Sequence, residues 1–195
     1  MISGLDWVEC GTPDAITQYA SQMATPTEAL PFWTPVAREE LLRTGATYRG
    51  VITYMELWDR VQEVTGIRTN VPMRHAVGKL LASVVEFSHK QGDPPITSLC
   101  VHQDGTIGPG YVEALRMNGH DEPADLELRA AEDRLSCYRA LASDLPVDGG
   151  RPYFTEQVAR KRDNAQRNTK PQAEGVLCPT CFMQMSLTGA CGTCD

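Results

Sequence analysis

Four cysteines near the C-terminus are the residues whose type and spacing specify chemistry most clearly. They form two Cys-x-x-Cys pairs separated by nine residues: Cys178 with Cys181, and Cys191 with Cys194. Two intervening residues let both thiolates of a pair turn onto one ion, and two pairs complete a tetrahedral Cys₄ site. We therefore predict one Zn²⁺ per chain. Four thiolates leave no open coordination position, so we expect the ion to be structural.

A redox pair is the alternative interpretation of a Cys-x-x-Cys motif. In thioredoxin-like folds one such pair lies between a strand and a helix. No strand or helix pattern surrounds this tail, and its motif is duplicated. Both facts favour a metal site. Residues 177–195 resemble a short zinc ribbon, which implies a small module held together by its ion.

Positive charge is concentrated in one segment just before these cysteines. The whole chain has a net charge of -7. Residues 1–150 carry 12 Lys and Arg against 21 Asp and Glu, whereas residues 151–170 carry 6 against 2. Arg160, Lys161 and Arg162 lie at the centre of this segment. We expect residues 146–176 to form a basic helix and linker that contacts nucleic acid, with a solvated tether as the alternative.

The remaining cysteines and the apolar residues indicate the compartment. Cys10, Cys100 and Cys137 are odd in number and widely scattered, so they suggest no disulfide framework. The N-terminus has no basic segment followed by an apolar run, and no stretch is apolar enough to span a bilayer. We therefore expect a cytoplasmic protein with no membrane span.

Helix signals precede and cover the middle of the chain. We expect residues 1–33 to be an N-terminal extension that packs on the main body, and residues 34–145 to form that body. Thr34-Pro35 predicts one helix start. Thr53-x-x-Glu56 is a capping box and predicts a helix over 54–64. Apolar residues at three-to-four spacing predict a third helix from about residue 70 to Gly92.

The next segments complete the predicted body. Residues 96–102 are rich in apolar and β-branched side chains, and Gln103-Asp104-Gly105 is a tight turn signal. We predict a β-hairpin there, followed by a final helix over 124–143. The expected fold class is mainly α with a small β-hairpin, a winged-helix-like body, and a C-terminal zinc ribbon.

In winged helices the third helix commonly enters the major groove of DNA, and the hairpin wing contacts the backbone. The third helix here and its approach carry more positive than negative side chains in an otherwise acidic body. The candidate DNA contacts are Arg68, Arg74, His75 and Lys79. The alternative is that these residues only solubilise the exposed side of a core helix.

The middle of the chain resembles the DNA-binding domain of the alkylguanine-DNA alkyltransferase and alkyltransferase-like family. Three segments carry the resemblance: Ile52 to Leu57 resembles its Thr-Tyr-Gly-Glu-Leu helix start, Arg74 to Gly78 its Arg-Ala-Val-Gly recognition helix, and Asp104 to Gly108 its Asp-Gly-x-Leu-Gly turn. About sixty residues are covered. The resemblance implies a winged helix that meets DNA through its third helix.

The family's nucleophile is absent. Its Pro-Cys-His-Arg motif should lie just upstream of the Asp-Gly turn, where this chain has Ile96-Thr97-Ser98-Leu99. Thr97 occupies the position of the reactive cysteine. Cys100 and His102 could meet as nucleophile and base on one face of a strand, but no third group is there to orient them. An inert core cysteine is the alternative, and we expect no catalysis.

The sequence thus favours a non-enzymatic accessory or regulatory protein that binds nucleic acid. DNA is the favoured partner, and RNA is the alternative. The alternative is an adaptor or inhibitor that docks a partner protein through its acidic body and its zinc ribbon. A hydrolase of unrecognised type is a third reading, because active sites are spatial clusters that one sequence does not display.

We predict that the chain accepts no alkyl group from DNA. A threonine hydroxyl has none of the thiolate character that alkyl transfer to this position requires. The measurement is an incubation with DNA that contains labelled O6-alkylguanine, followed by detection of label on the protein. Labelled protein would refute both the alignment of Thr97 and the inference from it.

Overall fold

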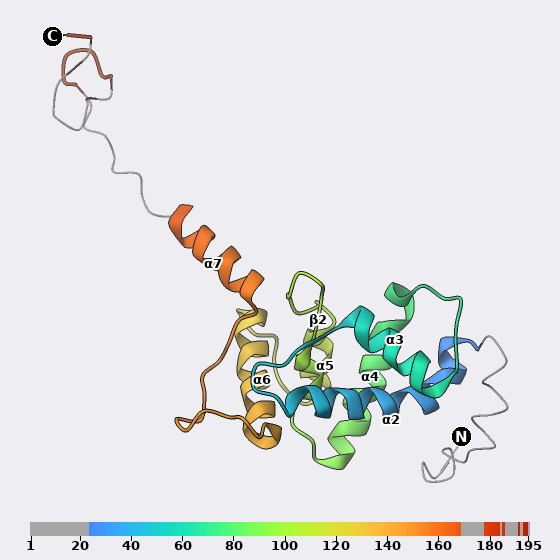
Figure 1. Ribbon diagram of the computed structural model, residues 1–195. Coiled ribbons are helices and arrows are strands. Elements are labelled where there is room, and N and C mark those ends of the chain that lie inside the picture. Colours follow the sequence, from blue (N-terminus) through green and yellow to red (C-terminus); the bar gives the residue numbers. More distant parts are fainter. Residues whose placement is uncertain (1–23, 169–177, 184, 186–190, 192, 195) are drawn as a thin grey trace. The chain divides into compact units, whose positions relative to one another are not determined.

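Six α-helices and a two-stranded sheet form the described part of the chain (Figure 1). The computed structural model describes residues 24–168, 178–183, 185, 191, 193 and 194. The chain divides into two compact units, Met1–Val158 and Ala159–Asp195. Cys10 and most of the predicted N-terminal extension lie outside the described residues. The predicted fold class, mostly helical with a small β element and a C-terminal cysteine cluster, is confirmed.

The first described helix is longer than the sequence signals suggest. Helix α2 spans Pro26–Gly45 and begins with a capping box, in which Glu28 N–H donates to the Thr25 hydroxyl and the Glu28 carboxylate accepts from Thr25 N–H. The prediction of a separate start at Thr34 is wrong. Thr34 is buried, and its hydroxyl donates to Ser83 on α4 at 2.9 Å. Packing against α4 offsets the backbone hydrogen bond that Pro31 and Pro35 each remove, and the helix continues through both.

The next two helices form where their local signals place them. Helix α3 spans Tyr54–Thr65, and the predicted capping box of Thr53 and Glu56 is present. It ends at Gly66, which adopts a left-handed conformation with φ of 69°. Helix α4 spans Met73–Gln91 and ends in the same way at Gly92. Both glycines stop their helices because a left-handed residue without a side chain carries no steric penalty.

The predicted β-hairpin wing is wrong. Residues Ile96–Leu99 form a short 3-10 helix, η1, and strand β2 (Cys100–Val101) pairs in parallel with strand β1 (Ile52–Thr53). Every residue from Ile96 to Val101 is buried, so this apolar run is a core segment and not an exposed wing. The tight turn is real, since Gly105 N–H donates to the His102 carbonyl at 2.8 Å. The chain then continues into helix α5 (Tyr111–Met117), which the sequence did not predict.

Two further helices follow. Helix α6 spans Leu126–Leu141, close to the predicted helix, and Asp125 caps it by accepting from Leu128 N–H at 3.0 Å. Helix α7 spans Glu156–Asn168 and carries the basic segment. No helix in the described ranges has the length and apolar character needed to cross a bilayer.

One main hydrophobic core joins α2, α3, α4, η1 and α6. Trp33 of α2 is fully buried, meets Trp58 of α3 edge to face at 5.0 Å between ring centroids, and donates from Nε1 to the Ile67 carbonyl. A smaller cluster around Val85, Tyr111 and Ala130 packs α5 onto α4 and α6. These two clusters fix the exposed side of α4 and the turn before α5, which together form the candidate site.

Candidate metal centre and nucleic-acid interface

The four C-terminal cysteines gather into one cluster. Their sulfur atoms all lie within 4.8 Å of one another. The Cys181 and Cys191 sulfurs are 3.4 Å apart, and those of Cys178 and Cys194 are 4.0 Å apart. A tetrahedral ion with metal–sulfur bonds of about 2.3 Å places its sulfurs roughly 3.8 Å apart. The predicted ligand set therefore fits a metal ion in its geometry.

Backbone groups of the two knuckles stabilise the thiolate form. The N–H groups of Cys181 and Thr180 donate to the Cys178 sulfur and lower the pKa of Cys178 to about 6. The N–H of Thr193 is the main cause that lowers the pKa of Cys191. Hydrogen bonds to a charged form favour that form. The tight turns thus favour the thiolate of the first cysteine in each pair, whereas hydrogen bonds with the Cys181 and Cys191 sulfurs raise the pKa of Cys194 to about 11.

The basic side chains of the body separate into two groups by their partners. Most of those before residue 150 are already satisfied. Five arginines pair with carboxylates: Arg38, Arg43, Arg60, Arg116 and Arg129. Three more lie over tyrosine rings or donate to backbone carbonyls: Arg49, Arg134 and Arg139.

The second group lies entirely on α4 and its approach. Within the described body, Arg68, Arg74, Lys79 and Lys90 have no carboxylate within 4.0 Å, and all four are exposed. Arg74 donates only to the neighbouring His75 ring, at 3.1 Å. Three of the four predicted nucleic-acid contacts in the body therefore carry charge that no described carboxylate neutralises.

The exposed side of α4 also contains Gly78. A side-chain carbon placed there would meet no atom within 4 Å, so packing does not require a glycine at this position. The same holds for Gly110, which has an ordinary helical φ of -62°. By contrast, a side chain at Gly108 would collide with the Tyr54 hydroxyl. Gly78 and Gly110 therefore leave room for something outside the fold.

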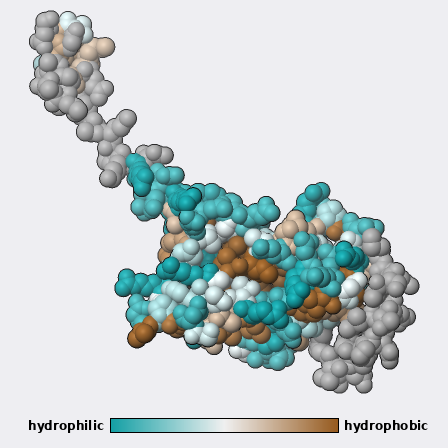
Figure 2. All heavy atoms as spheres, viewed as in Figure 1, coloured by the Kyte–Doolittle hydropathy of each residue, from teal (hydrophilic) through white to brown (hydrophobic). Residues whose placement is uncertain are grey.

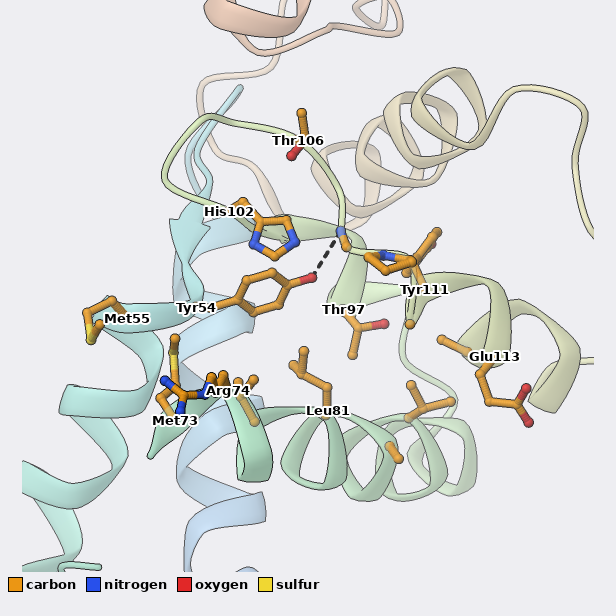
Figure 3. Close-up of a pocket in the computed structure, with 18 of the residues that line it drawn as sticks. Tyr54, Met55, Met73, Arg74, Leu81, Thr97, His102, Thr106, Tyr111 and Glu113 are labelled. Atoms are coloured by element: carbon orange, nitrogen blue, oxygen red, sulfur yellow. Dashed lines mark hydrogen bonds between the residues drawn. The ribbon is translucent and has the colours of Figure 1, made fainter. Parts of the chain in front are cut away.

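A cavity of about 930 Å³ lies beside this face of α4, and both open glycines line it (Figure 3). Its walls come from the start of α3, from α4 and from the segment between His102 and Tyr111. Apolar side chains predominate, among them Met55, Met73, Val77 and Leu81. In the same view as Figure 1, hydrophobic surface gathers over β2 and α5 (Figure 2).

Tyr54 is the polar centre of this cavity. Its hydroxyl accepts a hydrogen bond from Gly108 N–H at 3.1 Å, and its ring meets the His102 ring edge to face at 4.7 Å between centroids (Figure 3). Burial raises the pKa of Tyr54 to about 12, so the phenol is neutral near pH 7. The cavity thus combines apolar walls with a neutral phenol, and Arg74 lies among its lining residues.

Cys100 and His102 do not form a catalytic pair. Cys100 is completely buried, and burial raises its pKa, so its thiol stays protonated. His102 is exposed and meets the Tyr54 ring edge to face. Thr97 is buried on η1 and lines the cavity.

The three predicted contacts on α7 lie in the second compact unit. Arg160 and Lys161 are exposed and Arg162 is half-buried. Within the first unit, the hydroxyl of Thr155, the residue before α7, donates to the Gly105 carbonyl at 2.8 Å.

No family model, curated protein or solved structure matches the chain.

The sequence predicted the cysteine cluster and the exposed basic residues of α4, and it did not predict the cavity. Tyr111 and Met117 of α5 went unnoticed because the Gly108-Pro109-Gly110 run signals only a break, not the short helix that follows. Met55 and Met117, which line the cavity, are 43% and 37% exposed, and only the structure reveals this exposure.

We predict that Cys178→Ser releases the metal ion and leaves the body folded. The loss of one of four thiolates removes a ligand for which nothing else substitutes, while the core of α2, α3, α4 and α6 contains none of these residues. Elemental analysis of reduced protein purified without chelator measures the ion, and circular dichroism measures the helices. Thr180→Ala is the matched control and should retain one ion, because it keeps the backbone N–H that faces Cys178. Metal-free wild-type protein would contradict this centre.

Proposed function

We propose that this chain is a non-enzymatic accessory or regulatory protein that binds nucleic acid, with DNA as the favoured partner. We further propose that a structural zinc ion holds its C-terminal segment together. The observation that carries the proposal is the distribution of charge partners. The basic side chains that contact no described carboxylate are collected on α4 and its approach in an acidic protein.

The unpaired charge favours a polyanion as the partner. Arg68, Arg74 and Lys79 are exposed, and no described carboxylate neutralises them. Phosphate contacts by such side chains supply most of the non-specific affinity for DNA. Elsewhere in the body, arginines such as Arg60 and Arg116 each meet two carboxylates. Those pairs repel phosphate at the other surfaces, so α4 is the favoured contact.

The open glycines support close approach of a large partner. A glycine inside a helix costs about 1 kcal/mol relative to alanine. Gly78 bears this cost in α4 although a side chain would fit there without any contact. A backbone that DNA approaches closely gives a reason for such a glycine. Gly110 provides the same room on the other side of the cavity.

The cavity beside α4 supports DNA over a generic polyanion. Its apolar walls and its two tyrosines, Tyr54 and Tyr111, suit a flat aromatic group such as a base turned out of the duplex. Arg74, the proposed phosphate contact, also lines the cavity. The resemblance to the alkyltransferase family points to the same use of the third helix. Thr97 in place of the cysteine leaves binding without transfer.

The ion at the C-terminus is proposed to be zinc. Four thiolates at tetrahedral spacing are the donor set of structural zinc sites. Such thiolates persist in a reducing compartment. We therefore propose that the protein is cytoplasmic. The basic helix α7 would then be a second contact on the same nucleic acid, and two linked contacts raise the overall affinity through effective concentration.

An adaptor function is the second candidate, and one observation favours it. Residues 171–195 contain no Lys, Arg or His. Phe182 and Met183, directly after the first knuckle, are 75% and 59% exposed. A ribbon with exposed apolar side chains and no cation suits an apolar surface on a partner protein better than a phosphate backbone.

We predict that Arg74→Glu/Lys79→Glu weakens binding of duplex DNA more than reversal of Arg160, Lys161 and Arg162 does. A helix in a groove adds base-edge contacts to its phosphate contacts. Loss of two phosphate contacts should also lower the slope of log affinity against log salt by about 2. Fluorescence anisotropy titrations at several salt concentrations measure both quantities.

The control for this comparison is Arg43→Glu/Arg116→Glu. It changes the net charge by the same amount but alters side chains that already pair with Glu40, Glu113 and Glu122. It should bind within about twofold of the wild type, apart from the general effect of net charge. The reverse ranking of the two basic sites would make α7 the main contact. No binding of DNA or RNA by the wild type at low salt would favour the adaptor.

We predict that Gly78→Ala stabilises the fold and weakens DNA binding. Alanine should raise the free energy of unfolding by up to about 1 kcal/mol because its side chain meets no atom and lowers the entropy cost of the helix. Urea unfolding followed by circular dichroism measures the first effect and anisotropy the second. A variant that is stabilised and binds DNA like the wild type would refute close approach at α4.

A further inference from the structure

A second cavity, of about 340 Å³, lies in the body and is built differently from the first. It is lined by the end of α4, the segment from Asp93 to Thr97, helix α5 and the part of α6 from Arg129 to Ser136. The side chains of Val85, Thr97 and Tyr111 line both cavities and form the wall between them. Several polar groups are buried in this second cavity, which is unusual for a space left over by packing.

Ser88 is the first of these polar groups. Ser88 is 5% exposed, and its hydroxyl has no hydrogen-bond partner among the residues that the structure describes. A buried serine in a helix commonly donates to the carbonyl one turn before it, and Ser88 does not do so. A buried hydroxyl without a partner is costly, so its persistence points to a partner outside the fold.

Asp133 is the second. It is 6% exposed, and both of its partners use the same carboxylate oxygen. The Tyr111 hydroxyl donates to Oδ2 at 2.7 Å, and Arg129 Nε donates to the same atom at 2.9 Å. Oδ1 accepts no hydrogen bond from any described residue. The two donors fix the carboxylate in place and leave one acceptor atom for a ligand.

The other lining groups define the kind of ligand. The Thr97 hydroxyl and the Asn118 side-chain oxygen make no hydrogen bond with the described residues, although Asn118 Nδ2 donates to the Ala114 carbonyl. Pro94, Pro95 and Leu115 supply apolar surface. The site therefore offers acceptors and hydroxyls next to faces on which C–H groups can pack.

Charge balance excludes strongly ionic ligands. The Asp93 carboxylate is held by both nitrogens of the Arg38 fork, with one contact at 2.7 Å, and the Asp133 carboxylate is held by Arg129. Among the described residues that line the cavity, no carboxylate remains unpaired to bind a cation. His89 and His120 also line it. An anion finds no unpaired Lys or Arg among the described lining residues, because Arg129 already pairs with Asp133. A neutral ligand whose hydroxyls both donate and accept fits every group named.

We propose that this cavity binds a small neutral polyhydroxylated molecule, a sugar or polyol of about pentose size. Its hydroxyls donate to Asp133 Oδ1 and exchange hydrogen bonds with Ser88 and Thr97, while its C–H face packs on the prolines. A site of roughly 300 Å³ or more is large enough for a ligand of this kind. The site is separate from the α4 face and does not depend on nucleic-acid binding.

The test is a titration of the ¹⁵N-labelled full chain with D-ribose, followed in ¹H–¹⁵N correlation spectra. We expect saturable shifts for Ser88, Asn118 and Tyr111. Ser88→Ala should weaken the affinity roughly five- to tenfold, the effect of one hydrogen bond, without lowering stability, because it removes a hydroxyl that the fold leaves unpaired. Thr97→Val, of nearly the same shape, should weaken it as well.

Ser136→Ala is the matched control. Ser136 lines the same cavity, but it is exposed and its hydroxyl already donates to the Glu132 carbonyl. Its affinity for D-ribose should equal that of the wild type. The proposal is overturned if D-ribose causes no saturable shift at tens of millimolar, or if Ser88→Ala and Thr97→Val leave the affinity unchanged. Tighter binding of inorganic phosphate or of methylguanidinium than of D-ribose would overturn it too.

Discussion

A buried arginine holds together the segments on which the candidate sites of the body depend. Arg134 of α6 is 1% exposed, and it donates to the carbonyls of Ser98 and Tyr153 at 3.3 Å each. Burial lowers its pKa, because the charged guanidinium loses its water. Ser98 belongs to η1, and Tyr153 lies on the segment that leads to α7. One side chain therefore fixes η1, the wall that Thr97 contributes to both cavities, and the start of the basic helix. The loss of either carbonyl would leave a buried charge without a hydrogen-bond partner. Such a loss is strongly destabilising, because nothing would then offset the free energy of desolvating the guanidinium.

The charge pairs of the body explain how an acidic protein can present a basic surface. Arg38 fixes Asp93 just after α4, and Arg129 fixes Asp133 one turn later in α6, where Asp133 also accepts from the Tyr111 hydroxyl of α5. These pairs neutralise the positive charge of arginines that hold structural segments in place. The basic side chains on the exposed side of α4 have no such role, because the apolar stripe and the Thr34–Ser83 hydrogen bond attach the helix to the core. Its basic side chains consequently remain available to a partner, and the net charge of -7 conceals them.

The two compact units differ in what stabilises them. The body buries a continuous core in which Trp33, Leu41, Leu57 and Leu80 are fully enclosed. The described part of the C-terminal tail contains no comparable set of apolar side chains, and Phe182 lies largely in solvent. Its cysteine cluster takes the place of a core. Small modules of this kind obtain their folding free energy from metal binding, which is why four thiolates suffice where few side chains are buried.

The sequence by itself determined the features that rest on short-range chemistry. Thr53 and Glu56 cap α3 wherever the helix lies, Gly92 ends α4 because its own backbone turns left-handed, and the Cys-x-x-Cys spacing brings sulfurs together without help from the body. Only the tertiary structure decided the rest. Residues 96–101 looked like a hairpin, yet burial on all sides turned them into η1 and a strand parallel to β1. The two cavities, the unpaired Ser88 and the arginines left without a carboxylate follow from which distant segments meet. Such meetings depend on side chains far apart in the sequence, and no local pattern encodes them.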